Sequence, residues 1–374
     1  MQRPSLANWL SPEHTFWSFR NVRELIPTAQ VDPDPVPRAL IRDIDSTLGA
    51  IPVEFHRGRQ TVLEFLGSTH VDSFTVVQGE SLVFEWLAPG ISDLEPHLIF
   101  SVTKSVTGML VGALVLEGLI NVDSPVTAYV PQVANSGFGN ASVRHLLDMT
   151  ASYQFKEDYS PGPDIVAYRN SVGWYPTALG SPDLHDFLTS LKGEGEHGKS
   201  FRYLSPTTEL AGWVVEAASG MHYAKALSKY IWSKIGTEAP AHITVDRQGS
   251  PRSAGGLSVI PRDLARFGMM IRDGGSGVID PGFLADVYHN GSSDQWASGD
   301  FKDWFPKGVY RSFCYRPGED PGVIMGLGIH GQCVYVDQPR GVVVAIQSSW
   351  PEPGNKDMDL DSFRVCRAVA QSLG

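Results

Sequence analysis

The segment HLIFSVTKSVTGMLVGALVLEGLI, at residues 97–120, carries the strongest local signal in the chain. Residues 97–100 favour an extended segment, and the long apolar run from Val106 to Ile120 predicts a helix. The tetrapeptide Ser101-Val102-Thr103-Lys104 stands at the junction of the two. Residues three apart on a helix share a face, so this pattern holds an amine next to a hydroxyl at a helix start.

Ser101 and Lys104 have the chemistry of a nucleophile and its base. A serine hydroxyl is a weak nucleophile at neutral pH and needs a base beside it. At the start of a helix, Ser101 would lie at the positive end of the macrodipole, which stabilises a developing alkoxide. Apolar residues surround the helix axis, so we expect a buried helix and a desolvated Lys104 with a lowered pKa. The alternative is a capping serine with a solvated lysine one turn later.

A second candidate element is the segment Phe201-Arg202-Tyr203-Leu204-Ser205-Pro206. Ser205 suits the N-cap of a helix, Pro206 its first position and Gly220 its C-terminal end. Tyr203 is then expected on a short loop at a helix entrance, where side chains often point into clefts. The alternative is a tyrosine that packs against neighbouring aromatic side chains.

The order of the predicted elements indicates an α+β fold. Strands near both ends of the chain surround a helical middle, from 101 to about 235, which favours a sheet domain with a mostly helical insertion. The predicted elements near the ends are a hairpin over 74–86 that turns near Gly79, strands at 328–336 and 341–348, and a helix at 358–373.

This pattern predicts three parts of the chain. Residues 1–70 are interrupted by prolines and predict a wrapping arm with one helix near Ala39 to Leu48. Residues 71–104 and 250–374 are expected to form the sheet subdomain, and residues 105–249 the mostly helical subdomain. We expect the active site between these two subdomains.

Composition argues against several classes of partner. The formal net charge of the 374 residues is −11, which disfavours nucleic acid and anionic membrane surfaces. The longest apolar run, Met109 to Leu116, is too short to cross a bilayer, and the N-terminus lacks the apolar stretch of a signal peptide. Cys314, Cys333 and Cys366 form no metal-ligand or redox pair, which is typical of free thiols in a reducing compartment. We therefore expect a cytoplasmic protein.

Residues 193–200, Gly-Glu-Gly-Glu-His-Gly-Lys-Ser, match the P-loop pattern of nucleotide-binding proteins. A P-loop needs a strand before it and a helix directly after it. This segment instead follows a helix-like run at 184–191 and leads into the extended residues 201–203. We interpret it as a polar loop. No H-E-x-x-H motif or His/Asp cluster indicates a metal, and we expect no cofactor.

Together, the two candidate elements resemble the first two motifs of the serine β-lactamase and penicillin-recognising superfamily, class C branch. Ser101-x-x-Lys104 corresponds to its nucleophile motif and Tyr203-x-Ser205 to its Tyr-x-Asn motif. Within the superfamily, the chain resembles the 6-aminohexanoate-dimer hydrolases and the family VIII carboxylesterases. The further segments that carry the resemblance are residues 142–150, 157–159, 254–257, 263–268, 326–332 and 348–351.

The resemblance implies a β-lactamase-like fold, an antiparallel sheet flanked by helices, and a covalent acyl-enzyme. It assigns Ser101 as the nucleophile and Lys104 with Tyr203 as one proton-relay unit, without deciding which of the two is the first base. The backbone N–H groups of Ser101 and Ile329 would form the oxyanion hole. The implied substrate contacts are Tyr159, Ser205, Gly328 and His330, with His330 as a wall of the site and not as the base.

Two departures from the family pattern bear on the substrate. Ser205 replaces the asparagine of the second motif, and Gly326-Leu327-Gly328 stands where Lys-Thr-Gly is usual. The missing lysine removes a cation that would hold a β-lactam carboxylate, which favours amidases and carboxylesterases of this fold. No residue from 160 to 172 is assigned, because that loop matches the family only with a gap.

We therefore expect a serine hydrolase that cleaves amide or ester bonds of small linear substrates, similar to the 6-aminohexanoate-dimer hydrolases. The alternatives are a carboxylesterase, a β-lactamase or DD-peptidase of the same fold, and a non-catalytic binding protein. The expected partner is a small amide or ester, without nucleic acid, membrane, metal or cofactor. The oligomeric state stays open, with a homodimer as one option.

Overall fold

The computed structural model describes residues 3–158 and 162–374. Its largest element is an eight-stranded sheet that is antiparallel except at one edge, where the last strand runs parallel to its neighbour. In spatial order its strands are β10 (Val309–Arg311), β11 (Cys314–Arg316), β12 (Val323–Gly328), β13 (Gln332–Asp337), β14 (Val342–Ser348), β5 (Val71–Gln78), β6 (Ser81–Leu87) and β2 (Ile41–Arg42).

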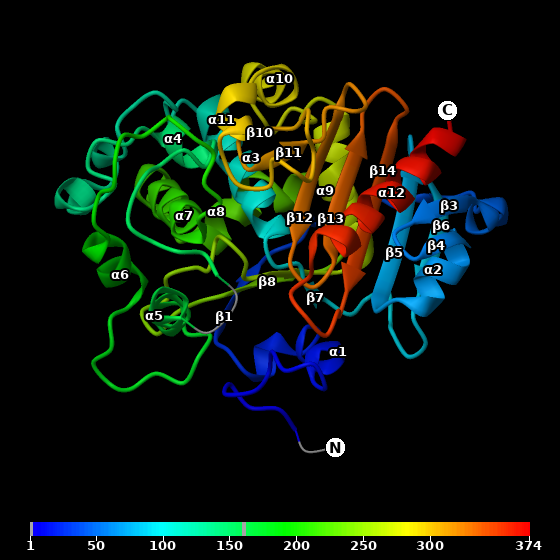
Figure 1. The fold of residues 1–374 in the computed structure, drawn as a ribbon, viewed down its shortest axis with the longest axis horizontal. Helices are drawn as coiled ribbons and strands as arrows, with labels where there is room; N and C mark the ends of the chain where they lie inside the picture. The colour runs from blue at the N-terminus through cyan, green and yellow to red at the C-terminus, as the bar shows by residue number, and fades with distance from the viewer. Residues whose placement is uncertain (1–2, 159–161) are drawn as a thin grey trace.

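Helices cover both faces of this sheet. Helix α9 (Pro261–Arg272) packs on one face against β5, β13 and β14, and α12 (Lys356–Ser372) lies on the other against β13 and β14 (Figure 1). Because neither face meets water, the central strands are apolar at most positions and do not alternate. All seven residues of β14 are buried. The expected α+β architecture and the C-terminal helix are both confirmed.

A smaller, four-stranded sheet leads directly to the nucleophile motif. Its last strand, β7, is separated from Ser101 only by Ile99 and Phe100, and the Ile99 N–H still donates to the Leu257 carbonyl at 2.9 Å. This sheet therefore fixes the start of helix α3 (Val102–Leu116). In order, its strands are β1 (Thr28–Val31), β8 (Ala241–Thr244), β9 (Leu257–Val259) and β7 (His97–Leu98).

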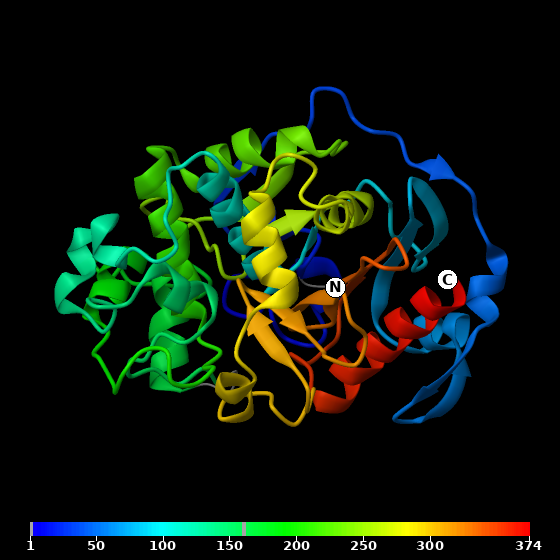
Figure 2. The same ribbon diagram turned by 90° about the horizontal axis from the view of Figure 1, so that it is seen from above.

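The predominantly helical part lies beside the large sheet, as the views from the front and from above show (Figures 1 and 2). Helix α3 contacts helices of this part and strands β11, β12 and β13, so it joins the two. The helices of this part are α4 (Val143–Leu147), α5 (Pro163–Ser171), α6 (Leu184–Ser190), α7 (Ser205–Ser219) and α8 (Tyr223–Tyr230). The elements outside it are α1 (Thr15–Ser18), α2 (Val62–Ser68), α10 (Pro281–His289), α11 (Ser293–Ala297) and the hairpin of β3 (Pro52–Phe55) and β4 (Gly58–Thr61).

The N-terminal segment contains no helix where one was expected, near Ala39 to Leu48. The chain there is extended, and its backbone N–H groups pair with carbonyls at the start of β6: Ile41 donates to Glu80, the residue before β6, and Asp43 to Leu82, each at 3.1 Å. Only a short 3-10 turn follows, at Ser46–Ala50, capped by the Asp45 side chain. Pairing with a sheet edge satisfies these backbone groups without a helix.

The hairpin predicted over 74–86 is confirmed, with Gly79 in the left-handed region at its turn (φ 54°). The predicted strand over 328–336 is confirmed from Gln332 onward, where β13 begins, but a turn at 329–331 separates it from Gly328, the last residue of β12. The thiols are free and buried. The expectation of free thiols is confirmed, and the thiols of Cys333 on β13 and Cys366 on α12 lie within hydrogen-bonding reach of each other without forming a disulfide.

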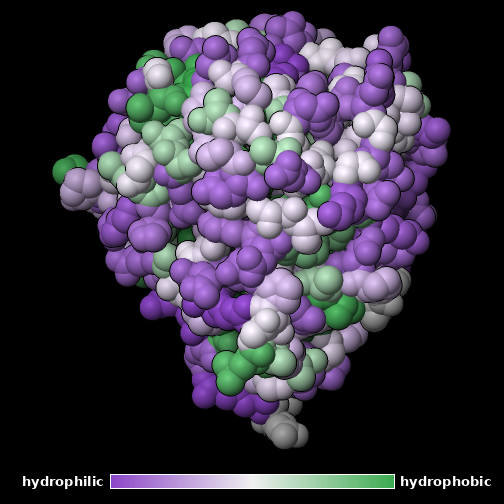
Figure 3. Space-filling view, turned by 90° about the vertical axis from the view of Figure 1, so that its left-hand side faces the viewer, coloured by the Kyte–Doolittle hydropathy of each residue, from purple (hydrophilic) through white to green (hydrophobic). Residues whose placement is uncertain are grey.

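The outer surface of the helical part is mostly polar. The face over the helical part is mostly hydrophilic, with small separate apolar areas (Figure 3). In the described part of the chain, no helix has both the length and the apolar composition needed to cross a membrane.

Candidate active site

Ser101 stands at the first turn of α3, but its hydroxyl caps no backbone N–H group. Lys104 Nζ, one turn along the same helix, donates a hydrogen bond to Ser101 Oγ at 2.9 Å. Both side chains are buried, with 9% of Ser101 and 1% of Lys104 exposed. The alternative of a capping serine beside a solvated lysine is therefore wrong, and the motif has the geometry of a nucleophile beside its base.

Lys104 has a full set of hydrogen-bond acceptors. Besides Ser101 Oγ, its Nζ donates to Ser205 Oγ at 3.1 Å and to the Ala254 carbonyl at 2.9 Å, which accounts for all three N–H bonds of an ammonium. Burial lowers the pKa of Lys104 to about 7, although the negative charge of Glu157 opposes this shift. Near neutral pH a substantial fraction of Lys104 is thus the free amine, which can accept the Ser101 proton.

Tyr203 also contacts the Ser101 side chain. Burial raises the pKa of its phenol above the ordinary value, while hydrogen bonds with the Ser101 and Tyr315 side chains act in the opposite direction. Its backbone N–H donates to Asp300 Oδ2 at 2.8 Å, which holds the loop before α7 in place. The hydrogen bonds of Lys104 go to other acceptors, but its Nζ lies 4.8 Å from the centre of the Tyr203 ring, so the two side chains also contact each other directly.

Ser205 is the first residue of α7 and not its N-cap, which is Leu204. The Ser205 hydroxyl instead accepts a hydrogen bond from Lys104 and donates one to Glu157 Oε1 at 2.7 Å. Glu157 Oε2 also accepts from the Ser205 backbone N–H at 3.0 Å. A carboxylate from a distant segment thus satisfies the helix start, and the serine hydroxyl is left free to contact the lysine.

Glu157 is a residue of this candidate site to which the sequence motifs assigned no role. It belongs to a segment that resembles the 6-aminohexanoate-dimer hydrolases, but nothing in its spacing from Ser205 indicates a contact. Together, Lys104, Ser205 and Glu157 form a hydrogen-bonded chain that leads from the side of Ser101 to a half-buried carboxylate.

The turn after β12 brings a backbone segment against the nucleophile. His330 (φ 61°) and Gly331 (φ 85°) are both in the left-handed region, and this conformation interrupts the strand that was expected to run through them. A Cβ atom on Gly328 would lie 2.8 Å from the Ile99 carbonyl oxygen and 3.0 Å from Ser101 N. Only glycine allows the end of β12 to approach the nucleophile this closely.

His330 forms a wall of the site. Its Nδ1 hydrogen-bonds with the Trp350 carbonyl at 2.7 Å, and its ring packs against Phe100 and Phe19 at centroid distances of 5.1 and 4.8 Å. Burial lowers the pKa of His330 to about 4, so the ring is neutral at neutral pH. Phe19 brings the N-terminal segment into contact with this wall.

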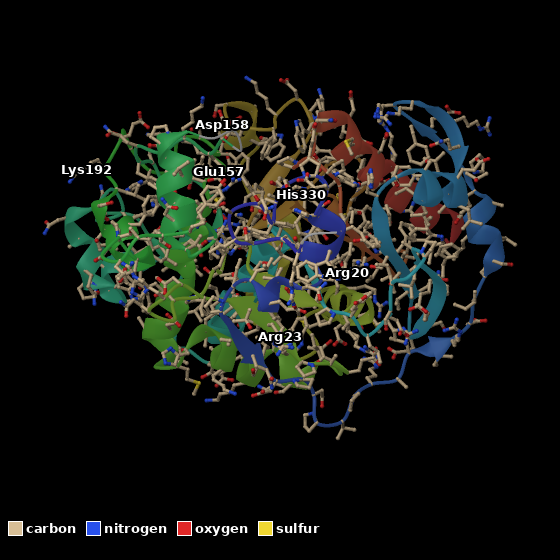
Figure 4. All side chains as sticks on the ribbon, turned by 90° about the horizontal axis from the view of Figure 1, so that it is seen from below. Arg20, Arg23, Glu157, Asp158, Lys192 and His330 are labelled. Carbon is tan, nitrogen blue, oxygen red and sulfur yellow. The ribbon has the colours of Figure 1, made fainter. Side chains whose placement is uncertain are left out.

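Two cavities meet at these residues and share Glu157, Ile329 and Pro353 in their walls. Tyr203 lines the larger one, of about 580 Å³, and Ser101 lines the smaller one, of about 340 Å³. Glu157 lies on the side of the helical part and His330 on the side of the strands (Figure 4). Tyr159, which the resemblance assigned to the substrate, lies outside the described residues.

The other sequence patterns lead to no second site. Residues 193–200 form a loop between α6 and the Tyr203 segment, and the helix that follows begins only at Ser205. Among the described residues, no group of three His, Cys, Asp or Glu side chains is arranged to hold a metal ion.

Comparison with known proteins shows the family to which the chain belongs. Residues 60–365 match the family model described as Beta-lactamase. The chain is 36% identical over 362 residues to a 6-aminohexanoate-dimer hydrolase from Paenarthrobacter ureafaciens, covering 94% of this chain and 90% of that protein.

Two solved structures share the fold. A candidate 6-aminohexanoate-dimer hydrolase from Bacillus anthracis superposes with a TM-score of 0.88 at 24% identity, over 99% of this chain and 97% of that one. A family VIII carboxylesterase superposes with a TM-score of 0.62 at 15% identity, over 82% of this chain and 93% of that one.

Proposed function

Since the chain belongs to the β-lactamase family of hydrolases, we propose that Ser101 is the nucleophile of a serine hydrolase that cleaves amide and ester bonds of small linear substrates. The observation that carries this proposal is the buried contact of 2.9 Å between Lys104 Nζ and Ser101 Oγ. The proposed site lies where α3 meets α7 on one side and β12 on the other. This is the junction between the proposed sheet subdomain (71–104 and 250–374) and helical subdomain (105–249).

In the proposed acylation step, neutral Lys104 accepts the Ser101 proton as Ser101 Oγ attacks the carbonyl carbon. The backbone N–H groups of Ser101 and Ile329 stabilise the oxyanion, and one such donor is typically worth about 3 kcal/mol. Tyr203 passes its proton to the leaving nitrogen or oxygen, and Lys104, whose Nζ lies 4.8 Å from the centre of the Tyr203 ring, returns to Tyr203 the proton that it took from Ser101. Water then cleaves the acyl-serine ester and restores the Ser101 hydroxyl.

The substrate class is tested by comparing kcat/KM for p-nitrophenyl butyrate, the linear 6-aminohexanoate dimer and a chromogenic cephalosporin. We expect the ester to be fastest, because its leaving group needs little protonation, and the cephalosporin to be slowest, because no third-motif lysine holds its carboxylate. A cephalosporin advantage of more than about tenfold, or about 1.4 kcal/mol, would identify a β-lactamase instead. The ratio of amide to ester turnover separates an amidase from a carboxylesterase.

Glu157→Gln is expected to shift the acid limb of the kcat/KM profile to lower pH. The general base must be unprotonated, so activity falls as the pH drops through the pKa of Lys104, which is about 7. The Glu157 carboxylate raises that pKa by its charge, and glutamine keeps the shape but not the charge. Rate–pH profiles of both proteins with the same ester measure the shift. An upward or absent shift would exclude this role. Glu196→Gln, an exposed site, is the control for net charge.

A further inference from the structure

If the proposed function holds, the positions of Ser101 and Tyr203 determine which end of a linear substrate enters which of the two cavities. The leaving group must reach the Tyr203 hydroxyl, which lines the larger cavity. The carbonyl carbon bonds to Ser101 Oγ, and Ser101 lines the smaller cavity. A linear substrate therefore extends its acyl chain into the smaller cavity and its leaving group into the larger one.

The smaller cavity contains two arginines, of which one is already neutralised. Arg252 pairs with Glu209 in the protein interior and also contacts the Tyr168 hydroxyl. Arg169 instead donates to the Tyr175 hydroxyl and lies 5.3 Å from the centre of that ring. Within residues 3–158 and 162–374, Arg169 has no ion pair with a carboxylate, and the five remaining residues carry no carboxyl side chain.

The charge of Arg169 acts on the wall of this cavity. It contributes, after burial, to lowering the pKa of His330, which lines the same space beside Ile329. The two carboxylates that also line the cavity are placed differently: Glu157 is bound by Ser205, and Glu352 is exposed to solvent. Arg169 is thus the cation available to a ligand at the far end of the acyl chain.

The larger cavity differs from the smaller one in the pairing of its basic side chains. Its two basic side chains are both paired, Arg202 with Glu194 and Lys156 with Asp158. Asp359 lines the same cavity, has a pKa that burial raises to about 8, and forms no ion pair within the described residues. A leaving group with its own carboxylate would meet no free cation there.

We propose that the smaller cavity is an anion-selective acyl site in which Arg169 binds a carboxylate at the end of the acyl chain. The substrate class is then an amide or ester whose acyl group is a linear dicarboxylic acid and whose leaving group carries no negative charge. This charge order is the reverse of that in a 6-aminohexanoate dimer, whose acyl half ends in an amine.

The reaction on such a substrate balances without a co-reactant other than water. A bond forms between Ser101 Oγ and the amide carbon, the C–N bond breaks, and the amine departs with the proton delivered by Tyr203. Water then attacks the acyl-serine ester, and the products are the free dicarboxylic acid and the regenerated Ser101 hydroxyl.

Three p-nitroanilides that differ only at the end of the acyl chain test this proposal: those of adipic acid (as the monoanilide), hexanoic acid and 6-aminohexanoic acid. We expect kcat/KM to decrease in that order, with the adipic compound ahead of the hexanoic one by about tenfold, as one charge-assisted bidentate contact allows. Arg169→Gln should abolish most of this ratio. Arg23→Gln is the matched control, since Arg23 is exposed and lies apart from Glu157 and His330 (Figure 4).

Equal rates for the three anilides, a lead for the 6-aminohexanoic compound, or a ratio that Arg169→Gln does not change would overturn the acyl site while leaving the hydrolase proposal intact. Calorimetric binding of the same anilides to the Ser101→Ala variant separates the two proposals. Tighter binding of the adipic compound, lost in Ser101→Ala/Arg169→Gln, supports the site even if wild-type protein cleaves none of them. Equal binding of all three contradicts it.

Discussion

Replacement of Ser101 by alanine is expected to lower kcat/KM for amides and esters by about 10⁴-fold or more, as for other serine nucleophiles. The reason is that no other group can form the acyl-enzyme, so only binding and oxyanion stabilisation would remain. The fold should be kept, because alanine is the best helix former and the lost hydroxyl caps no backbone group. Steady-state rates and thermal unfolding of the variant measure both effects.

Ser105→Ala is the matched control, since Ser105 is a buried serine of the same helix whose hydroxyl donates to the Phe313 carbonyl and contacts no proposed catalytic group. It should retain activity within a few-fold. Labelling by a fluorophosphonate should occur at Ser101 in the wild-type protein and disappear in Ser101→Ala. Labelling of a different serine, with Ser101 unmodified, would refute the assignment.

Lys104→Ala and Tyr203→Phe are each expected to slow acylation by about 10³-fold, and the double variant should lose much less than the product of the two effects. Both groups act on the same proton, because Lys104 donates to Ser101 Oγ and Tyr203 hydrogen-bonds with the same side chain. Single-turnover acylation rates for the four proteins of this cycle give the coupling between the two residues.

Lys104→Met keeps most of the buried volume and checks that the loss does not come from a cavity in the core. Tyr203→Phe keeps the ring contact with Phe301, at a centroid distance of 5.4 Å, so its effect reports the hydroxyl. If the two losses multiply fully, the residues do not share a proton path. If Tyr203→Phe retains full activity, Tyr203 is a packing residue.

The buried position of Lys104 gives the site both reactivity and fragility. Desolvation makes the lysine a usable base near neutral pH, but the same burial makes each of its hydrogen-bond partners necessary. Ser205 and the Ala254 carbonyl hold the amine in place, and Glu157 partly offsets the cost of its charge. The site therefore depends on segments from four separate regions of the chain.

The catalytic pattern could be predicted from the sequence where it rests on local geometry. Ser101 and Lys104 are three residues apart, and helix periodicity alone brings them together. The hairpin at 71–87, helix α12 and the entrance of α7 also follow from patterns within one element. Short motifs in the right order were enough to indicate the family, which the match over residues 60–365 confirms.

Contacts between distant segments were decided by tertiary packing alone. The bonds of Glu157 to Ser205, the approach of Gly328 to Ser101 N and the contact between the free thiols of Cys333 and Cys366 join residues on different elements, for which spacing along the chain carries no information. The turn at 329–331 shortened a predicted strand at its start, because left-handed His330 and Gly331 reverse the chain beside Ser101. Likewise, whether Arg169 is free or paired depends on which carboxylates fold next to it. Local periodicity therefore indicated Ser101 and Lys104 as the proposed nucleophile and base, whereas the three-dimensional packing determined the charge and shape of the space around them.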